Sequence, residues 1–222
     1  MSDAKLQAGS QLEIGTDKIR NSQSAIRNSP LEPITLQGAN VRLEPLSLAH
    51  LEQLCEVGLE PDLWRWTTTQ LNNRDDMTAY VDTALREQQR GTALPFVTIL
   101  KETGRVVGST RFGNIDLDNR HLEIGWTWVG VPWQRTAVNP EAKYLMLRHA
   151  FETLSCIRVE FKTDSLNERS RRALLRIGAR EEGTHRNHMI VHDGRYRHSV
   201  FYSVIDSEWP DVKAKLEKML LG

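Results

Sequence analysis

The chain has 222 residues, of which 39% are apolar and 26% are charged, and this size and composition predict one domain around one core. Lysine plus arginine and aspartate plus glutamate number 29 each, so the formal net charge of zero argues against nucleic acid or an anionic membrane as a partner. No apolar run reaches the roughly 18 residues of a membrane helix, and the N-terminus lacks the apolar run of a secretory signal, so we expect a cytoplasmic protein.

The first 33 residues differ in composition from the rest of the chain. Residues 1–33 are rich in Ser, Asn, Gln and Ala, contain few large apolar side chains and end in SPLEP. A segment of this kind buries too little apolar surface to offset the entropy of ordering it. We therefore predict a flexible extension over residues 1–33 and a folded domain over residues 34–222.

Helix and strand patterns alternate through the first part of this domain. Ser47 is a good cap for a helix whose apolar residues follow at helical spacing, and a second helix is expected over residues 76–90. Strands are predicted over residues 41–45, 95–100, 105–114 and 121–129. The last three of these strands follow one another closely, so they should form an antiparallel meander.

Helix and strand patterns also alternate through the second part of the domain. The predicted elements are a helix over residues 140–154, a strand over residues 157–163, a helix over residues 167–177, two strands around the turn at residues 192–195, and a helix capped by Ser207. Asn139 is a favourable N-cap for the first of these helices, and Gly178 is a favourable C-cap for the second. The element order predicts a mixed α/β (α+β) fold.

The passage from the strand at residues 121–129 into the next helix has the form of an anion site. The first backbone N–H groups of a helix lack internal partners and lie at the positive end of its dipole, so they attract phosphate. Any strand-loop-helix passage shares this feature, however, and no glycine lies between Gln134 and Asn139. Eight arginines between Asn167 and Arg197 could hold a phosphate, or they could form a solvated face.

Four blocks carry a family resemblance: EIGWTW, WQRTAVNPEAK, KTDSLNERSRRALLRIGA and SVIDSEWP. With these blocks, from Ile34 to the C-terminus, the chain resembles the RimJ/RimL-type branch of the GNAT acetyltransferases. The resemblance implies the GNAT fold, a central, mostly antiparallel, twisted sheet of six to seven strands flanked by helices. It also implies an N-acetyltransferase that uses acetyl-CoA as co-substrate, without a metal, and acetylates a primary amine by direct attack in a ternary complex. The acceptor would be a protein N-terminal α-amine or a small-molecule amine.

The resemblance also implies the residues that bind coenzyme A. Backbone N–H groups of a Q/R-x-x-G-x-G/A loop hold the pyrophosphate in this family, and the loop here consists of Gln134, Arg135, Thr136, Ala137, Val138 and Asn139. Ala137 and Asn139 stand where glycines are usual; Ala adds one methyl group, and Asn tolerates a left-handed conformation. We expect the site to survive this change.

The pantetheine arm is expected in a slot where the strand ending at Val129 to Val131 parts from the strand over residues 157–163. In the family, pantetheine completes the sheet there, and the thioester carbonyl would meet a backbone N–H near Val129 or Val131. The resemblance places Asn167 on the pantetheine arm and Ser170 near the sulfur atom. Asn167 could also simply cap its helix, and one side chain can do both.

Acetyl transfer requires a group that takes the proton of the acceptor amine, which is mostly charged at pH 7. Strand alternation puts His121, Glu123, Gly125 and Thr127 on one face and Leu122, Ile124, Trp126 and Trp128 on the other. Glu123 is a carboxylate within an apolar strand, where desolvation would raise its pKa, and the family often assigns a glutamate here as general base. The alternative is a structural Glu123 paired with an arginine such as Arg111, and His121 is a weaker candidate.

Other candidate residues complete the predicted site. The family's general-acid tyrosine is missing from the helix over residues 167–177, so Ser170 is the expected substitute. Trp64 and Trp66 lie in the loop that would wall the acceptor site, where they could clamp the acceptor or only pack. A homodimer and a noncatalytic acetyl-CoA-binding module stay open as alternatives. Cys55, Cys156 and the late histidines have no metal-site spacing, so we predict no metal.

Overall fold

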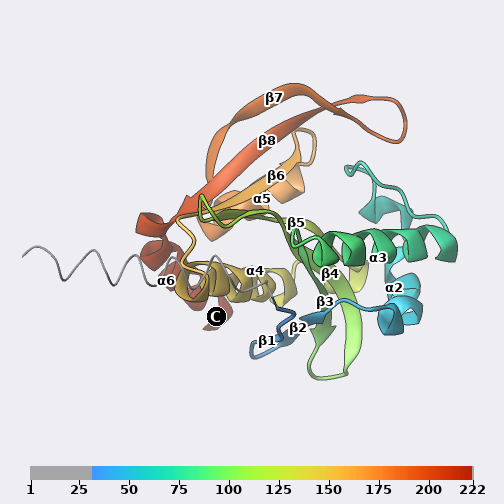
Figure 1. The fold of residues 1–222 in the computed structure, drawn as a ribbon, viewed down its shortest axis with the longest axis horizontal. Helices are drawn as coiled ribbons and strands as arrows, with labels where there is room; N and C mark the ends of the chain where they lie inside the picture. Colours follow the sequence, from blue (N-terminus) through green and yellow to red (C-terminus); the bar gives the residue numbers. More distant parts are fainter. Residues whose placement is uncertain (1–31, 222) are drawn as a thin grey trace, which may run out of the picture. The chain divides into compact units, whose positions relative to one another are not determined.

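The computed structural model describes residues 32–221, and the predicted extension over residues 1–33 lies almost wholly outside the described residues. Residues 33–222 form one unit around a single sheet (Figure 1). Its strands are β1 (Leu36–Gln37), β2 (Val41–Pro45), β3 (Leu94–Leu100), β4 (Arg105–Asp116), β5 (His121–Val129), β6 (Arg158–Asp164), β7 (Arg180–Ile190) and β8 (Tyr196–Ile205). Its α-helices are α2 (Leu51–Gly58), α3 (Arg74–Gln89), α4 (Val138–Arg148), α5 (Glu168–Ile177) and α6 (Trp209–Leu221).

The sheet has the strand order β1-β2-β3-β4-β5-β6-β8-β7. All neighbouring pairs are antiparallel except β5 and β6, which are parallel. The predicted mixed α/β fold with a mostly antiparallel sheet is therefore confirmed. The count of eight strands exceeds the predicted six to seven because of β1, a two-residue edge strand too short to leave a periodic pattern.

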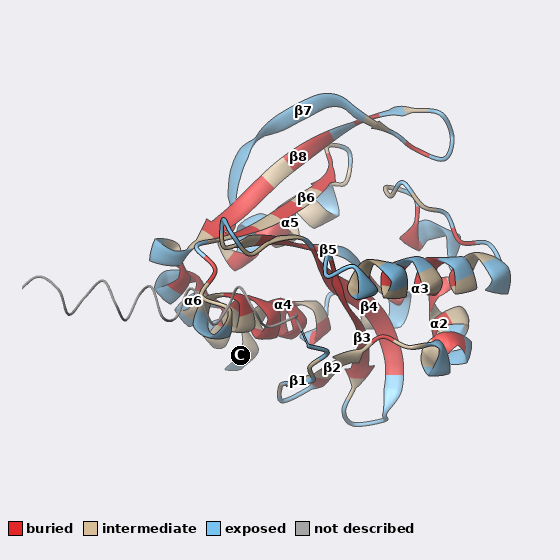
Figure 2. Ribbon diagram, in the orientation of Figure 1, coloured by how far each residue is buried: buried red, intermediate tan, exposed pale blue. Residues whose placement is uncertain are grey.

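Helices cover both faces of the sheet and enclose two apolar cores. The first core lies against α4, α5 and α6 and includes Phe96, Phe112 and Phe161. The second lies against α2 and α3 and includes Val97 and Trp128. Figure 2 shows β4, β6 and β8 largely buried, whereas β7 at the sheet edge is almost entirely exposed. The sheet positions the site because its central strands cannot move without disturbing both cores.

Three helix starts differ from the predictions. Ser47 precedes a short 3-10 turn, η1 (Leu48–His50), that leads into α2, whose own N-cap is His50. Helix α4 begins at Val138 with Ala137 as its N-cap, so the expectation of Asn139 as N-cap is wrong. The Thr136 hydroxyl accepts the Val138 N–H at 3.3 Å, and the helix begins two residues earlier than it would with Asn139 as its N-cap. Ser207 lies inside a short 3-10 turn, η5 (Asp206–Glu208), that precedes α6, so it does not cap that helix.

The caps of α5 agree with the sequence. The Asn167 side chain accepts the Ser170 N–H at 3.0 Å, and Gly178 ends the helix with φ of 106°. Only glycine adopts such a left-handed angle without steric cost, which is why this position ends the helix. The cap fixes the orientation of the first turn of α5, and this turn faces β6.

The expected alternation along β5 is broken at Trp126. Its φ of 49° and the register shift opposite Ser109 and Arg111 mark a β-bulge, in which one extra residue reverses the faces that follow. The Trp126 ring lies 5.6 Å from Lys162 Nζ, whose partner is Glu123, so Trp126 shares the face of Glu123. Thr127 instead contacts Lys143 on the α4 side. The predicted faces of Trp126, Thr127 and Trp128 are therefore wrong, while those of Leu122 to Ile124 hold.

Candidate active site

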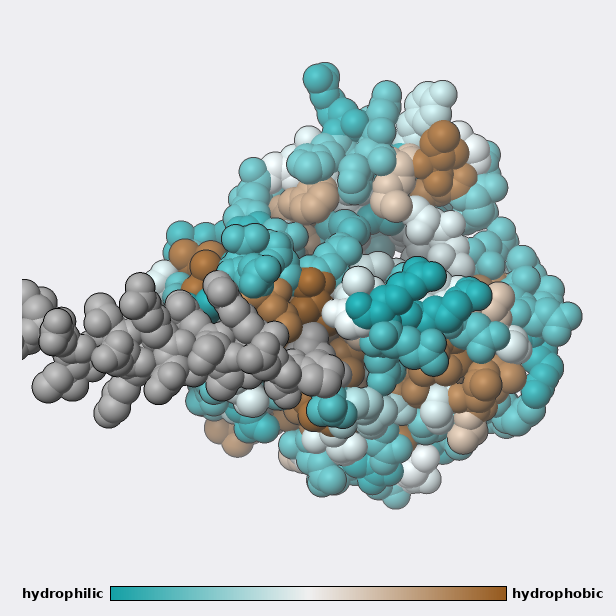
Figure 3. Space-filling view, in the orientation of Figure 1, coloured by the Kyte–Doolittle hydropathy of each residue, from teal (hydrophilic) through white to brown (hydrophobic). Residues whose placement is uncertain are grey.

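A cleft opens where β5 and β6 part. The two strands pair only at their beginnings, from His121 opposite Arg158 to Glu123 opposite Glu160. Beyond Glu123 the strands diverge, and the cleft between them has a volume of about 750 Å³. Residues of α3, the start of α4 and the loop before it, α5, β7, β8 and the loop at residues 63–69 also line it. Figure 3 shows the hollow between the surface of α3 and the hairpin of β7 and β8.

One end of the cleft is formed by the loop before α4. The Gln134 side chain connects the end of β5 with α5. Its Nε2 donates to Val129 O at 2.9 Å, and its Oε1 accepts from Arg169 of α5. The Gly130 N–H donates to Val107 O of β4, and amides alternate sides along a strand, so the Val129 N–H faces β6 and the slot. The loop therefore presents backbone donors and the open N-terminus of α4 to one space.

The charge at this end is positive. Arg135 of the loop and Arg169, Arg172 and Arg176 of α5 line the cleft. The buried Oδ1 of Asn139 has no hydrogen-bond partner among residues 32–221. A buried polar atom without a partner implies a missing ligand or water, so these residues fit an anionic, amide-bearing group.

The two missing glycines do not strain the loop. Ala137 has φ of −67° and ψ of −13°, which any residue adopts, and Asn139 lies within the first turn of α4. The left-handed residue is Arg135, with φ of 64°. The loop thus needs neither glycine for its torsion angles, and the tolerance of Asn for left-handed angles is not used at Asn139.

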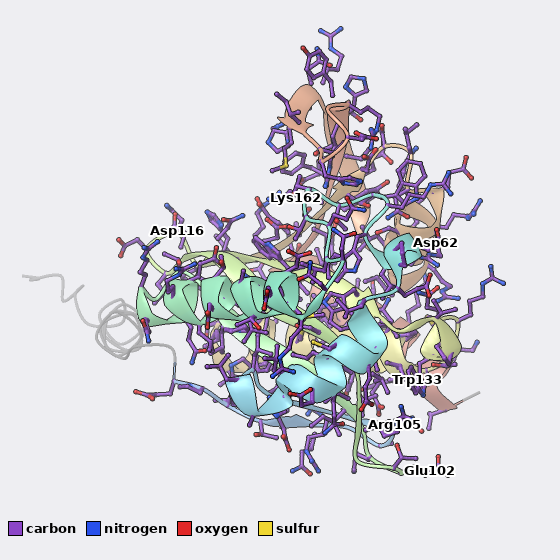
Figure 4. All side chains as sticks on the ribbon, turned by 90° about the vertical axis from the view of Figure 1, so that its right-hand side faces the viewer. Asp62, Glu102, Arg105, Asp116, Trp133 and Lys162 are labelled. Atoms are coloured by element: carbon purple, nitrogen blue, oxygen red, sulfur yellow. The ribbon has the colours of Figure 1, made fainter. Side chains whose placement is uncertain are left out.

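Glu123 lines the cleft and is 4% exposed. Its Oε2 accepts from Lys162 Nζ at 2.9 Å and from Asn114 Nδ2 at 2.7 Å (Figure 4 labels Lys162). The pairing with Arg111 that the alternative reading named does not form, because Arg111 pairs with Glu87 of α3 at 2.7 Å. Glu123 Oε1 lies over Gly125, 2.7 Å from the position that a Cβ atom would take there. The absence of a side chain at Gly125 thus leaves room for this oxygen.

Lys143 is a buried cation beneath the slot. It is 6% exposed, donates to Thr127 Oγ1 at 2.8 Å and lies 5.5 Å from the Phe161 ring. Burial lowers its pKa to about 7, and the charge of Glu123 opposes this shift. Lys143 was not predicted from the sequence, although it stands one helical turn before the buried Met146.

The other end of the cleft is walled by the loop at residues 63–69 and by β8. Trp64 is 3% exposed, donates through Nε1 to Gly58 O at 2.7 Å and packs on Trp128, which is a structural role. The Trp66 carbonyl accepts from Arg197 of β8 at 3.4 Å. Both tryptophans line the cleft, and Arg197 was missed because no local pattern connects β8 with this loop.

The structure brings most of the candidate residues together but not all of them. Among these, the cleft is lined by Glu123, Val129, Gln134, Arg135, Thr136, Asn139, Asn167, Ser170, Trp64 and Trp66. Val131, Ala137 and Val138 do not contribute to the lining. His121 lies outside the cleft, with its Nε2 3.5 Å from Asp116 Oδ2 at the far end of β4. Figure 4 shows Asp116 well apart from Lys162, so His121 cannot share the position of Glu123.

Several known proteins are similar to this chain in sequence or in fold. The sequence profile of the acetyltransferase (GNAT) domain matches residues 40–180, more than half of the chain. A protein of Bacillus subtilis (strain 168), named "Putative ribosomal N-acetyltransferase YdaF", is 33% identical over 110 residues, which are 50% of this chain and 59% of that protein. The match therefore spans less than two thirds of this relative's length.

Two solved structures have the same fold. A GCN5-related N-acetyltransferase from Brucella melitensis is 32% identical with a TM-score of 0.79, covering 86% of this chain and 87% of that one. The RimJ protein of Mycobacterium smegmatis, in complex with CoA-disulfide, is 23% identical with a TM-score of 0.73, covering 84% of this chain and 95% of that one.

Among the described residues, no helix is long and apolar enough to cross a membrane, and no group of three or more His, Cys, Asp or Glu suits a metal ion.

Proposed function

The chain belongs to the GNAT acetyltransferase family, and from this premise we propose that it transfers the acetyl group of acetyl-CoA directly to a primary amine in a ternary complex. The observation that carries the proposal is the cleft between β5 and β6, which joins the open N-terminus of α4 to the carboxylate of Glu123. The names of the relatives, a ribosomal N-acetyltransferase and RimJ, support the predicted RimJ/RimL-type branch. A cytoplasmic location belongs to the same proposal.

The α4 end of the cleft suits the donor. We assign the pyrophosphate to the backbone N–H groups between Gln134 and Val138, where the helix dipole favours negative charge. Arg169 and Arg172 on α5 add positive charge on the opposite wall. The Asn167 side chain lines the slot and suits an amide group of pantetheine. Acetyl-CoA, when bound, supplies an acetyl thioester, and the Val129 N–H would stabilise negative charge on its carbonyl oxygen.

Glu123 is the proposed general base. An acceptor amine enters mainly as an ammonium ion and must lose a proton before its nitrogen can attack. Lys162 and Asn114 hold Glu123 through Oε2, which leaves Oε1 toward Gly125 and the cleft. Oε1 would take the proton, directly or through one water molecule. The ion pair with Lys162 also fits a purely structural Glu123, and the Glu123→Gln variant described below separates the two roles.

Ser170 and Trp66 complete the proposed mechanism. Ser170 lines the cleft in the first turn of α5, beside Asn167, and its hydroxyl is the proposed proton donor to the departing thiolate. Trp66 is half-buried and walls the side of the cleft away from the α4 loop, where the acceptor would bind. Trp64 supports this wall through its packing on Tyr80 and Trp128.

A screen of primary amines with acetyl-CoA tests the proposal. Release of free thiol would be followed together with the mass of each amine, because thiol release alone also reports simple hydrolysis. We expect at least one α-amine or small-molecule amine to gain an acetyl group in step with thiol release. Binding of acetyl-CoA without acetylation of any amine would instead identify a noncatalytic acetyl-CoA-binding module.

A further inference from the structure

Arg197 on β8 is a buried cation without a carboxylate partner. It is 7% exposed and lines the cleft. Its Nε donates to Ser199 Oγ at 3.1 Å, and its Nη1 donates to Trp66 O at 3.4 Å. None of the ion pairs found among residues 32–221 includes Arg197. Burial lowers the pKa of Arg197, and the charges of Asp164 and Glu123 oppose this effect without pairing with it.

The neighbouring charges at this end are already paired. Glu123 holds Lys162 at 2.9 Å, and Asp164 holds Arg195 at 2.7 Å. Arg111 is held by Glu87. Besides Lys143, whose pKa burial lowers to about 7, the charge that remains is the guanidinium of Arg197. A buried charge without a counter-ion is unfavourable unless a ligand supplies one.

Arg197 belongs to the acceptor end of the cleft. It contacts the backbone of the loop that carries Trp66, whereas the arginines of α5 lie at the opposite end, where Arg169 contacts Gln134. The phosphates of the donor are assigned to that opposite end. An anion that pairs with Arg197 would therefore come from the acceptor.

We propose that Arg197 binds a carboxylate of the acceptor, so that the substrate is an amine with a carboxylate a few bonds away from its nitrogen. This inference rests on the proposed acetyltransferase function. A planar guanidinium binds a carboxylate with two parallel hydrogen bonds, and the hydrogen bonds of Arg197 found among residues 32–221 use its Nε and Nη1 and leave its Nη2 available. Such an acceptor would place its ammonium group toward Glu123 and its carboxylate toward Arg197, two groups of opposite charge that line one cleft.

The charge balance explains why a plain amine would be a poorer acceptor. A simple ammonium ion would enter a site that already holds the unpaired guanidinium of Arg197, whereas an aminocarboxylate brings its own negative charge for Arg197. Two sources share this chemistry: the α-carboxylate of a free amino acid and the side-chain carboxylate of an acidic residue at a peptide N-terminus. The test must compare each source with its uncharged carboxamide.

The experiment compares two pairs of acceptors, alanine with alaninamide and aspartyl-alaninamide with asparaginyl-alaninamide. Each pair is tested with the wild-type protein and three variants. The variants are Arg197→Gln, Arg197→Lys and, as a matched control on the same hairpin, the exposed Arg186→Gln. We expect the wild type and Arg186→Gln to prefer one carboxylate over its carboxamide in kcat/KM by about tenfold to a hundredfold, the range of a charge-assisted pair. Arg197→Gln should lose this preference, and Arg197→Lys should keep part of it, while acetyl-CoA affinity and melting temperature stay near wild type.

A binding measurement separates this inference from the proposed function. Calorimetry with N-acetylalanine and its carboxamide, and with the two N-acetylated dipeptide amides, needs no turnover. Preferential binding of a carboxylate by the wild type and not by Arg197→Gln supports the site even if no amine is acetylated, in which case the proposed function fails alone. Equal binding and equal rates for each acid and its amide in the wild type, or an unchanged preference in Arg197→Gln, would overturn the inference.

Discussion

The two ends of the cleft are built in different ways. The donor end comes from one continuous stretch, residues 129–139, with support from a single helix, α5. The acceptor end is assembled from Asn114 on β4, Glu123 on β5, Lys162 on β6, Arg197 on β8 and the loop with Trp66. The donor end relies on backbone donors, whereas the acceptor end relies on side chains from five separate segments.

This difference predicts different responses to substitution. A site made of backbone N–H groups tolerates side-chain changes, which explains how Ala137 and Asn139 can replace glycines without strain. A site made of buried, paired side chains loses its function when one partner is changed. Substitutions at the acceptor end should therefore act on turnover, and those at the donor end should act mildly on affinity.

The largest effect is expected for Glu123→Gln. Gln keeps the shape and most hydrogen bonds but cannot take a proton, so turnover should fall by about 10²–10⁴-fold while acetyl-CoA affinity stays near wild type. Steady-state kinetics over a range of pH would measure both, with Glu160→Gln on β6 as control. The variant also leaves Lys162 unpaired, so its stability is measured in parallel. If Glu123 is only structural, stability falls by about 3–5 kcal/mol while turnover of the folded protein stays normal.

Lys143 lies between the two ends and should make stability depend on pH. Burial lowers its pKa from 10.5 in the unfolded chain to about 7 in the folded protein. Between these values the unfolded state binds more protons, so the free energy of unfolding should rise with pH by up to about 1.4 kcal/mol per unit. Below pH 7 the contribution of Lys143 should be constant and unfavourable.

The check is the difference in unfolding free energy between wild type and Lys143→Met, from denaturant titrations across this pH range. Met has a similar length and no charge, so the difference isolates the titration of Lys143. A difference that does not change between pH 7 and pH 10 would show that the ammonium group is not desolvated as described.

The contrast between the two ends of the cleft also shows how much of the structure can be predicted from the sequence. The meander, α5 with its caps, the parting of β5 and β6 and the donor loop follow from local periodicity, cap residues and the family blocks. The bulge at Trp126 could not be predicted, because it depends on register against β4 rather than on residue type. For the same reason the Lys162 partner of Glu123, and the presence of Arg197 in the cleft, appear only when distant strands are brought together.

Arg169→Gln tests the donor end and should have a moderate effect. Arg169 lines the cleft and holds Gln134, so its loss should weaken acetyl-CoA binding by about tenfold with little change in kcat. The loss should shrink at high salt, because this arginine is exposed and its charge is screened. Arg180→Gln on β7, outside the cleft lining, is the matched control, and unchanged affinity in Arg169→Gln would remove Arg169 from the site.

The smallest effect is expected for Ala137→Gly. Because Ala137 already has a helical torsion angle, restoring the family's glycine relieves no strain, and acetyl-CoA affinity should stay within about twofold of wild type. Arg135→Gly, at the left-handed position, should by contrast raise the stability of the protein without ligand by about 1 kcal/mol. Thermal melting and calorimetry would measure both, and a large gain in affinity for Ala137→Gly would contradict the backbone account.

Direct transfer of the acetyl group from acetyl-CoA to an amine, with Glu123 as the base, is tested most directly by a single-turnover mass measurement. Protein in excess over acetyl-CoA would be mixed with and without an amine that the screen identifies, and the intact masses of protein and amine would be followed. The account predicts that the acetyl group moves to the amine only when the amine is present, that the protein mass never changes, and that Glu123→Gln slows the transfer. An acetylated protein formed without the amine, or undiminished transfer by Glu123→Gln, would contradict it.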